Sequence, residues 1–201
     1  IGYETLEQNT TGARNNAVGC FALDDNTTGD YNDAHGYGAL TNNTTGDKNT
    51  AMGYLALYHA TTPSSNTAFG ANALDACTTG SGNVAVGSGA LGDNTTAADN
   101  TAVGRSAGYN ITTGQNNVCV GVQAGRSLTS GSNNILIGND PTPSTNNVSN
   151  EITLGNSSTA TLRCQTQTIS ALSDERDKTD IVDSTDGLNV INLLKPKKFT
   201  W

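Results

Sequence analysis

The sequence predicts an all-β fold: a parallel β-roll, or solenoid, with coils of seventeen residues, followed by a short α+β segment at the C-terminus. The first observation is a glycine every seventeen residues, and a fixed period of this size indicates one unit stacked on copies of itself. The second is a hydrophobic content of 34%, too low for a conventional core. The third is that the repeat is rich in Asn, Thr and Gly, which are poor helix formers. The glycines are Gly2, Gly19, Gly36, Gly53, Gly70, Gly87, Gly104, Gly121, Gly138 and Gly155.

Two further columns keep the same step. Asparagine lies four residues before the glycine, and alanine lies three residues after it. The asparagines are Asn15, Asn32, Asn49, Asn66, Asn83, Asn100, Asn117 and Asn134, and the alanines are Ala22, Ala39, Ala56, Ala73, Ala90, Ala107 and Ala124. The repeat therefore assigns residues 1–155 to one shaft.

Each coil is expected to contain a short strand just before its glycine. In "NTAVG" and its copies a small residue and a large apolar residue alternate, so the two columns lie on opposite faces of the strand. Equivalent residues such as Val86, Val103 and Val120 should stack roughly 4.8 Å apart. The "A-L" after the glycine predicts a second strand. "NTTG" predicts a turn in which Gly takes a positive φ.

Both strand faces are expected to be buried, because apolar residues occupy each of them. So thin a coil buries little apolar surface against roughly 1 to 2 kcal/mol of backbone entropy per residue. Self-association about the rod axis would cover the second face of every coil at once. The sequence thus predicts a homo-oligomeric fibre.

Several residues in the repeat allow two interpretations. His35 replaces valine in a large column and is either a packed histidine with one hydrogen-bond partner or part of an ion site near an axis. The "TT" ladders are interpreted as turn caps, with an ice-binding face as the alternative. Five tyrosines either pack between coils or form a sugar-stacking surface; they are Tyr31, Tyr37, Tyr54, Tyr58 and Tyr109.

Charge and cysteine spacing argue against several function classes. The net charge of −8, without a basic stripe, argues against nucleic acid or a membrane as partner, and no apolar run approaches the roughly 20 residues that span a bilayer. Cys20, Cys77, Cys119 and Cys164 have no C-x-x-C spacing, so no metal and no cofactor is expected. Scattered thiols fit assembly in a reducing cytosol.

The repeat fails after Gly155, and two further segments are expected. Residues 156–172 are predicted to form a neck or linker with one or two strands. Charge then rises, because residues 1–172 hold 12 acidic and 5 basic side chains and residues 173–201 hold 6 and 5. In this last segment "DGLNVINLL" predicts a helix that Pro196 ends, and "KKFTW" predicts a strand.

The repeat resembles the head repeats of trimeric autotransporter adhesins and the related shafts of bacteriophage tail fibres. The runs that carry the resemblance are "NNAVGCFAL", "NTAMGYLAL", "NTAFGANAL" and "NTAVGRSAG". The resemblance implies a trimer of left-handed parallel β-rolls. The unit here is longer than the usual adhesin-head repeat.

The segment "SDERDKTDI...GLNVINLLKPKKFTW" looks like the opening of the intramolecular chaperone domain at the C-terminus of phage endosialidases and tail fibres. In that family the domain helps the shaft to trimerise and then cuts itself off. By position, the resemblance implies Ser173 as the nucleophile and Lys178 as its base, with Asp174 and Arg176 supporting them and a cut between Leu172 and Ser173. A lysine can take the serine proton if its pKa is lowered. The alternative is that "SDERDK" is only a solvated charge cluster.

The expected function is that of a structural component of a phage tail fibre or similar appendage. The expected partners are two further copies of the chain, other virion tail proteins, and a host-surface glycan or protein. The expected location is the virion, after assembly in the host cytoplasm. The alternative is the head of a trimeric adhesin on a bacterial surface. Such chaperone domains run well beyond Trp201, so this chain is expected to show little self-cleavage.

Overall fold

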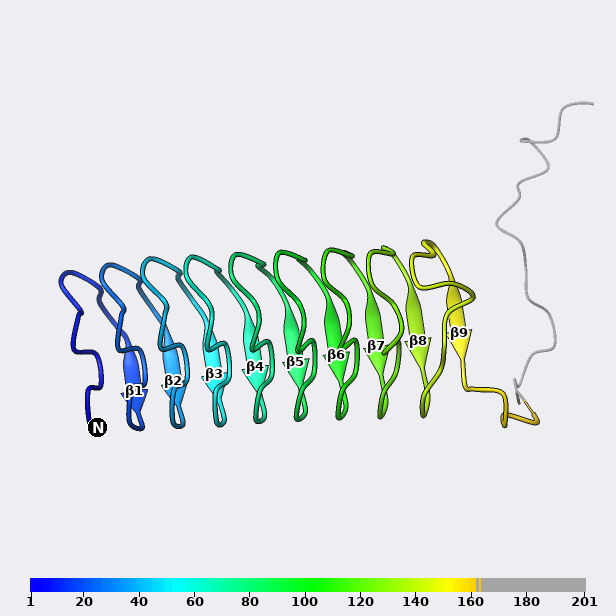
Figure 1. Ribbon diagram of the computed structural model, residues 1–201, viewed down its shortest axis with the longest axis horizontal. Coiled ribbons are helices and arrows are strands. Elements are labelled where there is room, and N and C mark those ends of the chain that lie inside the picture. Colours follow the sequence, from blue (N-terminus) through cyan, green and yellow to red (C-terminus); the bar gives the residue numbers. More distant parts are fainter. Residues whose placement is uncertain (162, 164–201) are drawn as a thin grey trace, which may run out of the picture. The chain divides into compact units, whose positions relative to one another are not determined.

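The computed structural model describes residues 1–161 and residue 163, and Ile1–Thr161 form one compact unit. Nine strands of three residues lie side by side in one parallel sheet, in sequence order (Figure 1). They are β1 (Asn16–Val18), β2 (Asp33–His35), β3 (Thr50–Met52), β4 (Thr67–Phe69), β5 (Val84–Val86), β6 (Thr101–Val103), β7 (Val118–Val120), β8 (Ile135–Ile137) and β9 (Ile152–Leu154). Each strand belongs to one coil of a β-solenoid.

The coils keep the predicted register of seventeen residues. Val86 pairs with Val103, and Val103 pairs with Val120. Each coil therefore presents the same positions to its neighbours, and the columns found in the sequence are columns in space. The parallel solenoid prediction is confirmed.

A ladder of asparagines runs through the interior beside the strands. The Nδ2 of Asn100 donates to Oδ1 of Asn83 at 3.3 Å and to the carbonyl of Gly114 at 2.8 Å. Its own Oδ1 accepts from the backbone and the side chain of Asn117, both at 3.0 Å. Since these asparagines are buried, each rung satisfies polar groups that would otherwise be costly. This role accounts for the asparagine that every coil carries at this position from Asn15 to Asn134.

Small and medium apolar side chains fill the rest of each coil. The middle strand residue is alanine from β1 to β6, and Leu23, Leu40, Leu57, Leu74 and Leu91 are fully buried at an opposite corner. In the coil that follows Leu91, Gly108 occupies the leucine position. Three residues further along the chain, Ile111 occupies the position that Asn94 has in the preceding coil. A Cβ on Gly108 would lie 3.1 Å from Cδ1 of Ile111, so one coil holds a large side chain at one corner or the other.

The expected second strand at "A-L" is wrong, because the described coils turn there instead. In the coil of Gly19, Phe21 and Leu23 have φ values of 61° and 52°. This left-handed conformation costs about 1 to 2 kcal/mol for a residue with a Cβ. Full burial of a leucine contributes about 1.5 to 3 kcal/mol, which is enough to offset the cost.

The "NTTG" turn is confirmed, but its glycine has another role than the one expected. Gly29 does not have a positive φ; the residue two positions later, Tyr31, does, at 59°. A Cβ on Gly29 would lie 2.6 Å from Oδ1 of Asn26, so glycine is needed for close approach. The threonine ladder also caps the turn, since Oγ1 of Thr27 donates to the carbonyl of Thr44 at 2.8 Å and this bond recurs in the neighbouring coils.

Candidate functional site

The outer face of the sheet is the candidate functional surface. The middle residue of β1 to β8 is buried, whereas the first and third residues point away from the coil interior and stay partly exposed. Val103 is 38% exposed and Phe69 is 52% exposed. Both faces of the strands were expected to be buried. Within one chain only the inward face, formed by the middle residues of β1 to β8, is buried.

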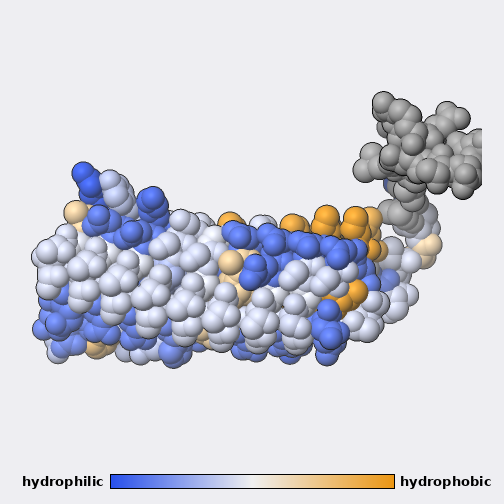
Figure 2. Space-filling model, turned by 90° about the horizontal axis from the view of Figure 1, so that it is seen from above, coloured by the Kyte–Doolittle hydropathy of each residue, from blue (hydrophilic) through white to orange (hydrophobic). Residues whose placement is uncertain are grey.

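This outer face becomes more apolar along the rod. From β5 to β9 its first and third residues are Val84, Val86, Thr101, Val103, Val118, Val120, Ile135, Ile137, Ile152 and Leu154. In the view of Figure 2, hydrophobic residues gather on the half of the rod that ends at β9. Side chains of this kind, in one continuous strip, indicate an interaction surface.

The other end of the outer face carries more polar side chains. Strand β2 presents Asp33 and His35 there, and Nε2 of His35 lies 3.2 Å from Nδ2 of Asn16 in the preceding strand. The histidine thus has one hydrogen-bond partner, as the packed interpretation expects, but it is only partly buried. The outer face is therefore more apolar from β5 to β9 than from β1 to β4, where Val18, Met52 and Phe69 alternate with polar residues.

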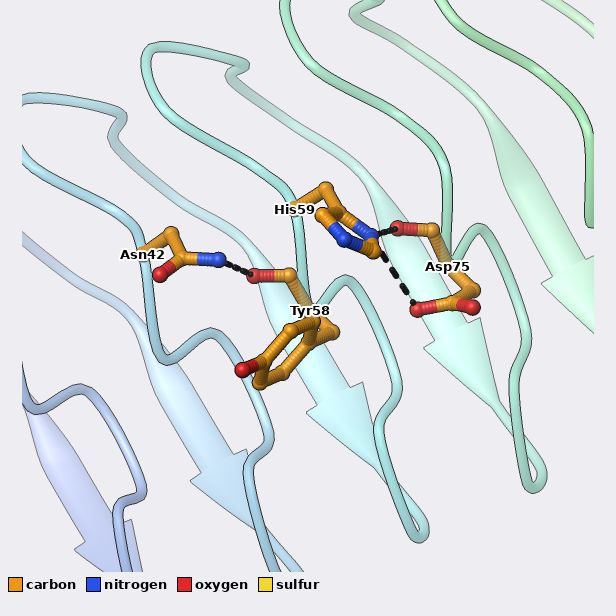
Figure 3. A network of polar contacts seen from close by, with 4 residues as sticks. All are labelled: Asn42, Tyr58, His59 and Asp75. Carbon is orange, nitrogen blue, oxygen red and sulfur yellow. Dashed lines mark hydrogen bonds and ion pairs between the residues drawn. The ribbon is translucent and has the colours of Figure 1, made fainter.

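A second titratable cluster lies in the turns that follow the strands (Figure 3). Nδ1 of His59 lies 3.0 Å from the backbone oxygen of Asp75 and 3.5 Å from its carboxylate Oδ1. Burial raises the pKa of the Asp75 carboxyl, and the nearby His59 partly offsets that rise. No serine, threonine or cysteine among the described residues hydrogen-bonds to the pair, so it does not form a catalytic triad. This pair was not predicted from the sequence, although its two residues are sixteen positions apart and so lie in adjacent coils.

The described cysteines differ in their exposure. Cys20 is exposed, whereas burial raises the pKa of the Cys77 thiol to about 11 and that of Cys119 to about 12. Within residues 1–161 and 163, no three His, Cys, Asp or Glu side chains come together as metal ligands. The same residues contain no helix with the length and apolar character of a membrane-crossing segment.

The residues predicted for self-cleavage lie outside the described part of the chain. They are Leu172, Ser173, Asp174, Arg176 and Lys178. The predicted helix and strand of residues 173–201, and most of the predicted neck, also lie outside it. The assignments for these residues stay predictions.

Comparisons with protein-family models, with curated proteins and with solved structures give no match to this chain. The function is therefore inferred from the surface of the rod and from the sequence motifs.

Proposed function

We propose that this chain is the shaft of a homotrimeric fibre, a structural component of a phage tail fibre or similar appendage. Residues 173–201 begin a chaperone module that promotes trimerisation and cuts the chain at Ser173 when the module is whole. The observation that carries the proposal is the continuous apolar strip on the outer face of β5 to β9. The resemblances of the repeat and of "SDERDK" support the order of three and the self-cleavage.

Burial of the outer strip favours association along the whole rod. Its apolar side chains are partly exposed, so covering each one contributes up to roughly 1 kcal/mol. The contributions add over successive coils, because every coil presents the first and third residues of its strand on the same outer face.

The two halves of the outer face also favour a parallel arrangement of the copies. In a fully overlapping antiparallel pair, β2 of one copy would meet β8 of the other, and Asp33 would face Ile135. Such a contact would bury an unpaired carboxylate against an apolar side chain. In a parallel arrangement about an axis along the rod, apolar levels meet apolar levels, and Asp33 of one copy faces the level of His35 in the next.

Sedimentation of the 201-residue chain at micromolar concentration tests the assembly. We expect a trimer for the unchanged chain, a loss of association for Val103→Asp, and a trimer for Thr113→Asp, whose exposed side chain lies away from the outer strip. Far-UV circular dichroism reports folding in the same samples. A folded monomer of the unchanged chain would contradict the proposal.

Disulfide cross-linking tests the parallel order. In a background with Cys20 and Cys164 replaced by serine, Ile137→Cys on β8 should link to the same position of another copy. An antiparallel assembly would instead give no link at this position.

Mass spectrometry of a protein that carries the whole chaperone module tests the self-cleavage. We expect a break between Leu172 and Ser173, its loss in Ser173→Ala and strong slowing in Lys178→Met. A Ser173→Ala protein cut at the same bond would remove the nucleophile assignment. Removal of the module after assembly would leave a fibre that refolds slowly or not at all, which gives it kinetic stability.

The resemblance of the repeat to adhesin heads supports a second candidate, the head of a trimeric bacterial surface adhesin. The sequence that flanks the chain separates the two, since an adhesin would continue into a coiled coil and a membrane anchor.

A further inference from the structure

A hollow of about 410 Å³ lies on the turn side of the first coils. Its lining comes from three successive coils and consists of Phe21, Tyr37, Gly38, Thr41, Tyr54, Leu55 and Tyr58. The volume falls within the range of small-molecule sites.

The hollow exists because Gly38 lacks a side chain. The equivalent residues one coil earlier and one coil later are Phe21 and Leu55, and all three have a positive φ. A Cβ on Gly38 would come within 2.6 Å of Cδ2 of Leu55, so a larger residue here would occupy the space. A glycine between two bulky residues, Phe21 and Leu55, thus opens the surface at this level of the rod.

Aromatic rings form the wall of the hollow. The rings of Tyr37 and Tyr54 are stacked at 5.6 Å with an interplanar angle of 18°, and Phe21 meets Tyr37 edge-on at 5.5 Å. Tyr37 and Tyr54 are each about half-exposed, at 49% and 55%. No described residue hydrogen-bonds to their phenolic oxygens, so two free hydroxyl groups face the solvent together with the parts of the two rings that the stack leaves uncovered.

Hydrogen bonds between coils hold the other side of the hollow. Nδ2 of Asn42 donates to the backbone carbonyl of Tyr58 at 2.8 Å (Figure 3), and Oγ1 of Thr41 donates to the carbonyl of Phe21 at 2.8 Å. These bonds hold the backbone beside the hollow in place before any ligand binds, which lowers the entropy cost of binding.

We propose that this hollow binds one neutral hexose ring of a glycan. The C–H face of a sugar ring packs on the negative face of an aromatic ring, and the phenolic hydroxyls can bond to the sugar hydroxyls. No charged side chain is part of the lining, which favours a neutral sugar over an acidic one. The site adds a binding activity to the proposed shaft and depends only on the fold of one chain.

A second hollow in the same register provides an internal comparison. It lies at Gly89, three coils after Gly38, and Tyr109 takes the place that Tyr58 has in the first hollow. Arg105 stands where the first hollow has Tyr54, and Asp75 and Asp93 also line it. Because the stacked wall is missing, the second hollow is not expected to bind a neutral sugar.

Saturation-transfer difference NMR tests the proposal with millimolar methyl glycosides of glucose, galactose, mannose, N-acetylglucosamine and N-acetylneuraminic acid. We expect saturation transfer to at least one neutral glycoside. Tyr54→Ala should weaken its binding about tenfold, the loss expected for one aromatic contact. Gly38→Leu should also abolish binding while keeping every tyrosine, since Leu55 shows that leucine adopts this backbone conformation. Tyr31→Ala is the matched control, because Tyr31 is 48% exposed and lies outside the hollow.

Three results would overturn the proposal: no transfer to any neutral glycoside, a response from the acidic glycoside alone, or equal binding by Gly38→Leu and the unchanged chain. Circular dichroism excludes misfolding as the cause of a loss. Sedimentation of the same samples reports the assembly separately, so failure of the sugar site and failure of the trimer are distinguishable.

Discussion

Asn117 donates a hydrogen bond of 3.0 Å from its Nδ2 to Oδ1 of Asn100 in the preceding coil, and both side chains are buried. The same oxygen of Asn100 accepts from the backbone of Asn117. The oxygen of one side chain therefore takes two hydrogen bonds from the next coil, and the ladder links adjacent coils from inside.

Asn100→Ala should lower the free energy of unfolding by about 3 kcal/mol, because it leaves buried groups of Asn83, Gly114 and Asn117 without partners. Asn139→Ala is the control, since Asn139 is exposed and should change stability by less than about 0.5 kcal/mol. Urea unfolding at fixed protein concentration measures both. Equal midpoints would show that the ladder does not contribute to stability.

Asn94→Cys should stabilise the protein by about 1 to 3 kcal/mol, because Asn94 is fully buried and neither its Oδ1 nor its Nδ2 has a partner. The same column already holds Cys77 in the preceding coil, so the volume fits. Asn26→Cys should instead destabilise the protein, since Nδ2 of Asn26 donates hydrogen bonds to Oδ1 of Asn9 at 2.8 Å and to the carbonyl of Gly29 at 3.1 Å. Thermal unfolding of the two variants decides it, and a loss of stability in Asn94→Cys would contradict the prediction.

Asp75→Asn should stabilise the protein at neutral pH, and the gain should fade toward about pH 3. Burial raises the pKa of Asp75, so its folded-state pKa lies above its unfolded one. The stability from the protonated carboxyl is complete below the unfolded pKa and is lost as pH rises through the folded pKa. Urea unfolding at both pH values measures the difference, with Asp25→Asn as an exposed control. A gain of equal size at both pH values would exclude this cause.

Cys20 should react with iodoacetamide in the folded protein, whereas Cys77 and Cys119 should react only after unfolding. Cys20 is exposed, and the other two thiols are buried with pKa values raised to about 11 and about 12, so little thiolate forms near pH 8. Peptide mapping by mass spectrometry with and without urea gives the three rates. Equal labelling of all three in the folded state would mean that the coil interior is open.

The register of the fold could be predicted from the sequence because identical residues must meet in adjacent coils. Asn83 and Asn100 need each other as hydrogen-bond partners, and their spacing in the sequence is the spacing of the coils. The "A-L" segment could not be predicted, since a leucine such as Leu40 adopts a positive φ only when tertiary packing offsets the local cost.

The surface features were harder to predict for a similar reason. A half-exposed residue such as Val103 and a buried one such as Ala102 both read as apolar columns, and only the fold shows which faces inward. The hollow at Gly38 depends on side chains from three coils, so no local pattern marks it. The available signal was a glycine whose equivalents in the two adjacent coils are Phe21 and Leu55.

The constant register has a consequence for how such a rod could change over generations. Since every coil repeats the same seventeen-residue pairing, an insertion or deletion of seventeen residues preserves every column. A change of any other size interrupts the asparagine ladder at one place. Recombination between tandem copies of the unit would thus lengthen or shorten the rod in equal increments of about 4.8 Å without new packing solutions. The length of the rod is therefore set by the number of copies of the repeat.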